Sequence, residues 1–130
     1  MKDLRKAFTL VEVMVVVAII ALLATILIPN LLRSRITANE SSAQTTLKGI
    51  SNALETYAST NHAYPTTTTS LLSALPPYLS TDYFTTTYHG YNYSVSLALY
   101  SYTITAIPAS SSQGINSYSI STSGVLVANP

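Results

Sequence analysis

The side chains of this protein that could carry chemistry are few and scattered. His62 and His89 have neither a carboxylate nor a second histidine at ligand spacing, so we expect both in surface loops. The many serines come with no Gly-x-Ser-x-Gly elbow and no glycine-rich phosphate loop. Calcium needs several oxygen ligands, and Asp82 is the only acidic residue after Glu55. We therefore expect no enzyme activity, no metal site and no cofactor.

Composition excludes further classes of protein. The 130 residues suffice for one small domain. Because the chain has no cysteine, it can form no disulfide framework, cysteine zinc cage or cysteine nucleophile. Charged residues make up 8% and apolar residues 48%, which argues against a disordered polyelectrolyte. All six Lys and Arg lie at or before Lys48, so we expect no nucleic acid partner, since phosphate binding relies on such groups.

One carboxylate stands in an unusual place. In residues 8–32, 20 of the 25 side chains are apolar, and Glu12 is the only charged one. A helix of this length rises roughly 37 Å, enough to cross a hydrocarbon core of about 30 Å. A carboxylate inside such a helix is costly and usually has a partner and a function. The segment therefore predicts a membrane-spanning helix in which Glu12 needs a partner.

Three interpretations of this N-terminal segment compete. Lys2, Arg5 and Lys6 precede it closely, so the positive-inside rule places the N-terminus in the cytoplasm and the rest outside. An ordinary secretory signal has a shorter apolar region followed by a small-x-small cleavage pattern, which is missing here. A plain membrane anchor explains the length and the basic flank but not Glu12. A prepilin-type signal is the third interpretation.

The residues resemble that third class closely. KAFTLVEVMVVVAII (residues 6–20), with Ile-Pro-Asn at residues 28–30, is similar to the prepilin signal and N-terminal helix of type IV pilins and their relatives. In that family a membrane peptidase cuts after the small residue, here Ala7, and the exposed amine of Phe8 is methylated. The family usually has glycine at this position, so Ala7 is a departure.

The resemblance also assigns Glu12 a partner. In the family this carboxylate pairs with the Phe8 ammonium of a neighbouring subunit and fixes the axial register between adjacent helices. Before assembly, Glu12 would then be poorly satisfied. The alternative is a glutamate near the membrane interface whose carboxylate reaches water.

Beyond Pro29 the apolar residues thin out into a stripe. The stripe consists of Ile36, Ala43, Leu47, Ile50, Leu54 and Tyr57. These intervals of mostly three and four residues are typical of an amphipathic helix, so we expect one helix from residue 8 to about residue 60, near 80 Å long. Pro29 removes one backbone hydrogen bond and should kink or loosen the helix. The resemblance implies that this stretch unwinds in a filament.

The remainder predicts a small sheet. Pro65 ends the helix region, because the residue before a proline avoids helical geometry, and residues 70–75 could form one short helical turn. Alternating apolar and polar residues predict antiparallel strands at 91–99 and 101–106. Gly124 favours a hairpin between strands near residues 118–120 and 125–127.

These elements define an expected fold and domain organisation. The fold class is α+β, with a long N-terminal helix packed against an antiparallel sheet of three to four strands, which is the pilin fold. We divide the chain into a prepilin leader (1–7), a hydrophobic transmembrane and filament-core helix (8–32) and a globular head (33–130). Without cysteines, hydrophobic packing and filament contacts must hold the C-terminal loop that a disulfide staples in many pilins.

The head also offers candidate modification sites. Asn39-Glu40-Ser41 and Asn92-Tyr93-Ser94 fit the Asn-x-Ser pattern, so Asn39 and Asn92 are candidate acceptors of N-glycans. The threonine run at residues 66–69 could carry O-glycans.

The resemblance implies a structural role. The chain would be a subunit of a type IV pilus-like extracellular filament for adhesion, motility or a related function, assembled through Phe8, Glu12 and Pro29. Implied partners are identical subunits, the prepilin peptidase and methylase, the pilus assembly machinery and, before assembly, the inner membrane. The alternatives are a minor pilin, a type II secretion pseudopilin or an unpolymerised membrane-anchored binding module. The shortage of carboxylates argues against the calcium-bearing major pseudopilin of type II secretion.

Overall fold

A computed structural model describes residues 7–130, so the basic leader residues Lys2, Arg5 and Lys6 lie outside the described residues. The chain forms two compact units, Met1–Ser34 and Arg35–Pro130. Helix α1 (Leu10–Asn61, 52 residues) contributes to both of them. This helix lies close to the expected bounds of 8 and about 60.

In the first unit, most side chains of α1 are apolar. Every side chain from residue 8 to residue 32 is exposed except that of Ala24, which is half-buried. Within residues 7–130, α1 is the one helix long and apolar enough to span a membrane. The helix continues through Pro29 without interruption, so unwinding there stays a prediction for the filament.

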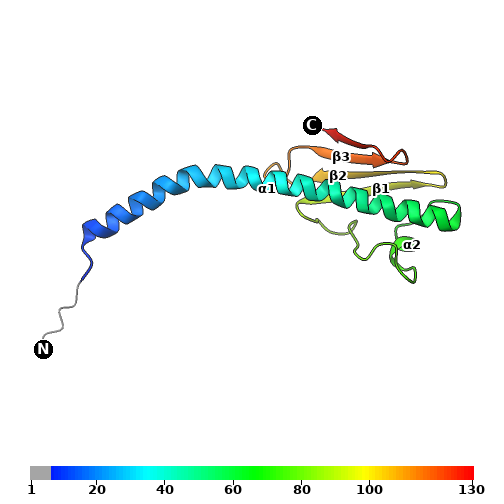
Figure 1. Ribbon diagram of the computed structural model, residues 1–130, viewed down its shortest axis with the longest axis horizontal. Helices are drawn as coiled ribbons and strands as arrows, with labels where there is room; N and C mark the ends of the chain where they lie inside the picture. Colours follow the sequence, from blue (N-terminus) through cyan, green and yellow to red (C-terminus); the bar gives the residue numbers. More distant parts are fainter. Residues whose placement is uncertain (1–6) are drawn as a thin grey trace, which may run out of the picture. The chain divides into compact units, whose positions relative to one another are not determined.

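The second unit contains a four-stranded antiparallel sheet. Its strands are β1 (Tyr91–Ala98), β2 (Ser101–Pro108), β3 (Ser117–Ser121) and β4 (Leu126–Asn129), and their spatial order follows the sequence. Figure 1 shows the C-terminal half of α1 lying along one face of this sheet. The expected α+β fold is confirmed, with four strands.

Alternation along the strands separates a buried face of the sheet from a hydroxyl-rich one. The buried face carries Tyr91, Tyr93, Tyr102, Ile104, Ala106, Tyr118 and Ile120. It packs against Ala43, Leu47, Ile50 and Leu54 of α1, all four with no exposed surface. These are the central members of the apolar stripe. On the opposite face, Ser94 pairs with Thr105, and their hydroxyl oxygens lie 2.6 Å apart.

A long connection joins α1 to the sheet. It contains the short helix α2 (Thr69–Leu72), which ends three residues earlier than the expected turn. Leu71 is buried, and its carbonyl oxygen accepts hydrogen bonds from the backbone N–H groups of Tyr78 and Leu79. His62 and His89 are exposed loop residues with positive φ of 59° and 47°, which confirms the expected surface placement.

Candidate functional site

The N-terminus of α1 brings three of the expected site residues together within about one turn. Ala7 and Phe8 precede the helix, Phe8 is 86% exposed, and Glu12 lies in the first turn. The backbone N–H and the hydroxyl of Thr9 both donate to Glu12 Oε2, over 2.9 and 2.8 Å. In return, the Glu12 backbone N–H donates to Thr9 Oγ1 over 3.2 Å. This reciprocal pattern is a capping box, which satisfies helix N–H groups that have no intrahelical partner.

The expectation that Glu12 is poorly satisfied within its own subunit is therefore wrong. Its carboxylate already has two donors from Thr9, and both reach the same oxygen, Oε2. The second oxygen, Oε1, takes no bond from Thr9. Thr9 is thus a residue of the site that the sequence interpretation missed, although the spacing Thr-x-x-Glu is a recognised signal for this cap.

A hollow of about 280 Å³ lies beside this cap. It is lined by Phe8, Glu12, Val13 and Val16. Apart from the carboxylate of Glu12, these side chains are apolar. This hollow can receive an apolar group and offer it one carboxylate oxygen at the edge. Its lining contains no Ser, Cys, Lys or His that could serve as a catalytic nucleophile or as a partner of Glu12 in acid–base catalysis.

In the second unit, Glu40 of α1 holds the loop between β2 and β3 (residues 109–116). Glu40 Oε1 accepts hydrogen bonds from the backbone N–H groups of Ile115 and Asn116, over 3.1 and 3.2 Å, and from Asn116 Nδ2 over 3.3 Å. Tyr91 Oη donates to the Asn116 carbonyl oxygen over 2.9 Å. Hydrophobic packing and filament contacts were expected to hold the C-terminal loop, and the hydrogen bonds from α1 to residues 115–116 were not predicted.

The packing of this loop on Tyr91 accounts for the glycine at position 114 and contributes to the raised pKa of Tyr91. A Cβ at Gly114 would collide with the phenol group of Tyr91, so the loop can approach this ring closely only with glycine there. Burial first, and the negative charge of Glu40 second, raise the pKa of Tyr91 to about 12.

The two candidate glycan acceptors differ in their surroundings. Asn39 is half-buried, and its Nδ2, the atom that would carry a glycan, donates to the Gln113 carbonyl oxygen over 2.9 Å. Asn92 is exposed on β1, and its Oδ1 accepts a hydrogen bond from Thr87 Oγ1 over 2.7 Å. Modification at Asn39 would therefore disturb the loop contact, whereas Asn92 is accessible in the folded head.

Glu55 organises a second polar cluster at the end of α1. It accepts hydrogen bonds from Tyr64 Oη, over 3.0 and 3.1 Å, and from Tyr102 Oη over 3.0 Å. The Tyr102 hydroxyl also lies 2.7 Å from Oγ of the buried Ser51. The two tyrosine rings meet edge to face at 5.0 Å. The cluster thus ties the segment after α1 to β2.

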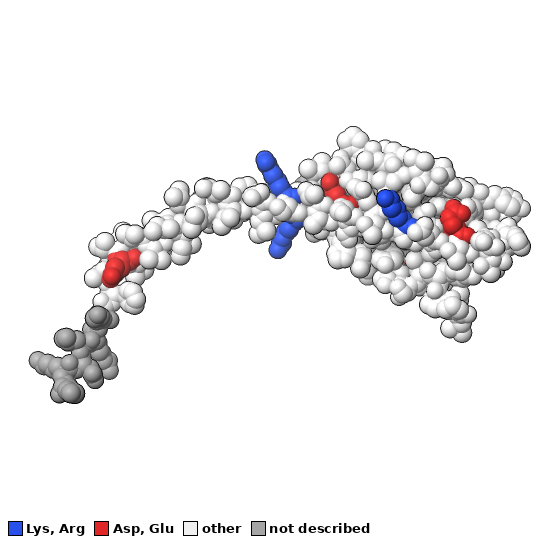
Figure 2. Space-filling view, in the orientation of Figure 1, with Lys and Arg blue, Asp and Glu red and all other residues white. Residues whose placement is uncertain are grey.

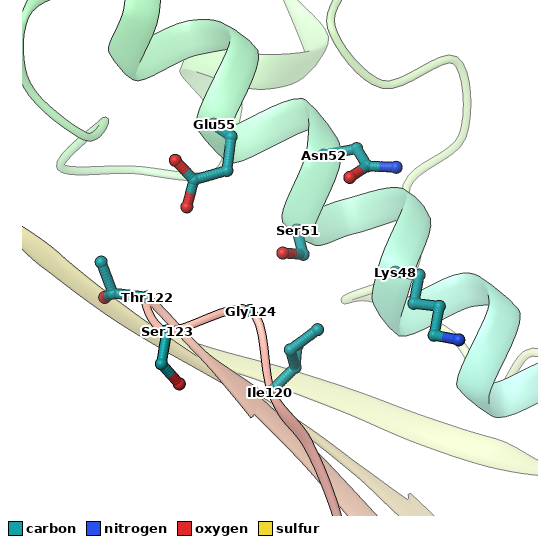
Figure 3. A pocket seen from close by; sticks show the side chains of 8 residues that line it. All are labelled: Lys48, Ser51, Asn52, Glu55, Ile120, Thr122, Ser123 and Gly124. Carbon is teal, nitrogen blue, oxygen red and sulfur yellow. The ribbon is translucent and has the colours of Figure 1, made fainter.

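A hollow with a volume of about 490 Å³ lies next to this cluster. Figure 3 shows Lys48, Ser51, Asn52 and Glu55 along α1, with Ser51 and Glu55 on the side toward the β3–β4 turn at residues 122–124; Ile120 also lines the hollow. The lining holds one cation, one anion and several hydroxyls, which form no catalytic set.

Neither a metal cluster nor a basic patch is present in the described part of the chain. Among residues 7–130, no three His, Asp or Glu side chains come together as a metal site would require. Asp82 accepts bonds from the Phe84 backbone N–H and the Thr85 hydroxyl, as is typical of a local turn. Figure 2 shows a surface with few charged residues, and Arg33, Arg35 and Lys48 are the only Lys or Arg from residue 33 onward.

A long N-terminal helix with Glu12 in its first turn, and with its C-terminal half packed on a small antiparallel sheet, is a pilin-like arrangement. Residues 3–28 match the family described as the prokaryotic N-terminal methylation motif. The type II secretion system core protein G of Escherichia coli strain K12 is 40% identical over 80 residues, covering 58% of this chain and 55% of that protein. The corresponding protein of Vibrio cholerae serotype O1 is 46% identical over 69 residues, covering 52% of this chain and 47% of that protein.

A pilus protein is similarly related. The type IV wide pilus major component PilA4 of Thermus thermophilus is 41% identical over 68 residues, which cover 52% of each chain. The chain spans about half the length of the curated relatives it matches. The motif, the fold and these relatives together support a likeness of the chain to type IV pilins and pseudopilins.

Proposed function

We propose that this chain is a structural filament subunit, made as a membrane-inserted precursor, cut between Ala7 and Phe8, methylated at the Phe8 amine and polymerised through its N-terminal helix. One observation carries the proposal: every apolar side chain of residues 8–32 except that of Ala24 is exposed. Such a surface needs lipid, or copies of itself, around it.

Energetics favour a helix that moves from membrane to filament. Lipid tails are as apolar as leucine, so transfer from the bilayer to a bundle of identical helices changes little hydrophobic free energy, and packing decides the outcome. Release into water is very different. At about 1.5 to 3 kcal/mol for each large side chain, exposure of this segment would cost tens of kcal/mol. An assembled filament should therefore not shed subunits spontaneously.

Glu12 is proposed to receive the new N-terminal amine of a neighbouring subunit. Thr9 holds Glu12 Oε2, so Oε1 is the oxygen that an incoming ammonium would meet. The hollow lined by Phe8, Val13 and Val16 would take apolar atoms from the same neighbour. Cleavage after Ala7 creates that amine, which couples processing to assembly.

The basic leader sets the proposed topology. Residues 1–7 stay cytoplasmic until the prepilin peptidase removes them, residues 8–32 span the inner membrane, and residues 33–130 form the outward-facing head. After assembly by the pilus machinery the filament is extracellular. The likeness to core protein G favours a second candidate of the same class, a pseudopilin of type II secretion.

Electron microscopy combined with mass spectrometry tests the proposal. Fibres sheared from cells that express the chain should consist of a subunit that lacks residues 1–7 and begins with N-methylated Phe8. An unpolymerised membrane-anchored binding module would yield no fibres. Fibres built from subunits with an intact Met1 would contradict the proposed processing. A secretion defect without surface fibres after deletion would favour the pseudopilin.

A further inference from the structure

Two arginines follow the apolar segment of α1 almost immediately. Arg33 is the first residue after residues 8–32, Arg35 comes two positions later, and both side chains are exposed. They are the first charged residues after Glu12, and the next Asp or Glu in the chain is Glu40. The stretch that leaves the proposed membrane span therefore carries positive charge, with no acidic residue within four positions of either arginine.

This placement runs against the usual distribution of basic residues around a membrane span. Lys and Arg normally gather on the cytoplasmic side, where they set the orientation of the helix. The leader supplies three of them, Lys2, Arg5 and Lys6, and the proposed cleavage after Ala7 removes all three. The processed chain would then keep basic side chains next to the span on its outer side alone. A basic pair that opposes the orientation signal points to a separate role at the outer surface of the membrane.

Helix geometry places both arginines at the level of the lipid headgroups. The 25 residues of the span rise roughly 37 Å, which exceeds a hydrocarbon core of about 30 Å. If the span is centred in this core, Arg33 and Arg35 follow at about 5 and 8 Å beyond its outer boundary. The headgroup layer is about 5 to 8 Å thick on each side of the core. Both residues therefore leave the helix where the lipid phosphates lie.

The two side chains suit phosphate in chemistry and in direction. A guanidinium group can donate two parallel hydrogen bonds to a phosphate, and it stays charged at physiological pH. Two positions along an α-helix correspond to about 200° of rotation, so Arg33 and Arg35 leave opposite sides of α1. Between them, the Ser34 hydroxyl donates to the Asn30 carbonyl oxygen over 3.0 Å and so stays on its own helix. The two arginines can thus hold two different lipid phosphates.

A second copy of the chain is a poorer source of negative charge for these arginines. Every acidic side chain among residues 7–130 already accepts hydrogen bonds within its own subunit; these are Glu12, Glu40, Glu55 and Asp82. Lipid phosphates are present at the right depth on all sides of an inserted helix. Charge complementarity therefore favours the lipid surface as the partner.

We propose that Arg33 and Arg35 bind phosphate groups of anionic phospholipids in the outward-facing leaflet of the inner membrane. This binding rests on the membrane-inserted stage of the proposed function and does not require the filament. It holds the span at a fixed depth after the basic leader has been removed.

Tryptophan fluorescence in lipid vesicles tests the binding. The chain has no tryptophan, so Leu31→Trp, at an exposed position two residues before Arg33, provides one local reporter. The full chain is reconstituted in vesicles of equal phosphatidylcholine and phosphatidylglycerol. In each sample one of the two lipids carries bromine, a quencher of this fluorescence, on its acyl chains. Both lipids contain a phosphate, but only phosphatidylglycerol has a net negative charge. Stronger quenching by the brominated phosphatidylglycerol therefore measures enrichment of anionic lipid beside the arginines.

The reporter chain should prefer phosphatidylglycerol several-fold, because each arginine near an anionic surface strengthens binding by roughly fivefold. Arg33→Gln combined with Arg35→Gln should abolish the preference. Lys48→Gln is the matched control, because Lys48 is also an exposed basic residue of α1 but lies roughly 20 Å beyond Arg35 along the helix. This variant should keep the full preference. Inorganic phosphate, added at constant ionic strength, should also leave the preference unchanged.

Three results would overturn the proposed binding: equal quenching by the two lipids, a preference that survives the loss of both arginines, or an equal loss with Lys48→Gln. A preference that inorganic phosphate abolishes, but chloride of the same ionic strength does not, would identify a site for free phosphate and overturn the lipid as partner. Flotation of the vesicles separates these results from the proposed function. A chain that floats with the vesicles but shows no lipid preference leaves membrane insertion and filament assembly standing. A chain that does not float would overturn the membrane-inserted stage and, with it, this binding.

Discussion

Thr9 and Glu12 hold each other at the start of α1: Glu12 Oε2 accepts the Thr9 backbone N–H and hydroxyl over 2.9 and 2.8 Å, and the Glu12 N–H donates back over 3.2 Å. The carboxylate proposed to bind a neighbouring subunit is therefore oriented before that neighbour arrives. A group that is fixed in advance loses less entropy when it binds. We therefore predict that Thr9 has a positioning role in assembly.

Thr9→Val should weaken assembly while leaving membrane insertion intact. The substitution keeps the branched shape but removes the hydroxyl, and loss of an N-cap side chain costs about 1 kcal/mol. We expect fewer filaments at an equal level of subunit in the membrane. Thr25→Val is the matched control, because the Thr25 hydroxyl only bonds the Ala21 carbonyl oxygen in the same helix. Equal filament counts for the two variants would refute the positioning role.

Two substitutions of Glu12 separate charge from capping. Glutamine can still accept the Thr9 bonds of a capping box, whereas alanine cannot. Both changes should leave membrane insertion intact or improved, since an uncharged residue is cheaper in lipid. If the carboxylate binds the neighbour's amine, Glu12→Gln and Glu12→Ala should both give few or no filaments. Normal filaments with Glu12→Gln would show that capping, and not charge, is what assembly needs.

Local periodicity was enough to predict most of the fold. The expected helix and strands agree with α1, β1, β2 and the β3–β4 hairpin to within about two residues, because alternating burial leaves a direct pattern in the sequence. The β1–β2 turn has no such local signal, since Leu99 and Tyr100 occupy it without Gly, Asn or Asp.

Contacts distant in sequence could not be predicted in this way. Glu40 and Asn116 are 76 residues apart, and no pattern in the chain links them before the sheet is built. The edge-to-face contact of Tyr83 and Tyr88, with ring centroids 5.0 Å apart, likewise depends on the path of an irregular loop. The bond between Thr9 and Glu12 is different, because its three-residue spacing is a local signal that was available in the sequence.

Glu40→Ala should destabilise the head by about 2 kcal/mol, because two backbone N–H groups and one amide lose a charged acceptor. The effect should appear as a lower melting temperature of the full chain in detergent. Asn52→Ala, an exposed change on the same helix, should leave that temperature nearly unchanged. Equal melting temperatures for the two variants would show that Glu40 does not hold the loop.

High pH should destabilise the head through the half-buried Tyr64 and the buried Tyr91. Burial first, and hydrogen bonding to Glu55 second, raise the pKa of Tyr64 from 10.0 to about 12, and the pKa of Tyr91 is raised to about 12 as well. Between these values the unfolded chain loses protons that the folded head keeps. This contribution to the free energy of unfolding is therefore complete below about pH 10 and declines as the pH rises toward 12.

Denaturant unfolding of the detergent-solubilised chain across this pH range measures the decline. Tyr64→Phe should make the free energy of unfolding fall less steeply with pH, because it removes one of the groups whose pKa differs between the folded and unfolded states. Tyr100→Phe is the matched control, since Tyr100 is 76% exposed at the β1–β2 turn, and its slope should equal that of the parent. If Tyr64→Phe left the slope as steep as the control does, the shift in the pKa of Tyr64 would be refuted. The loss of stability would then have to come from other groups.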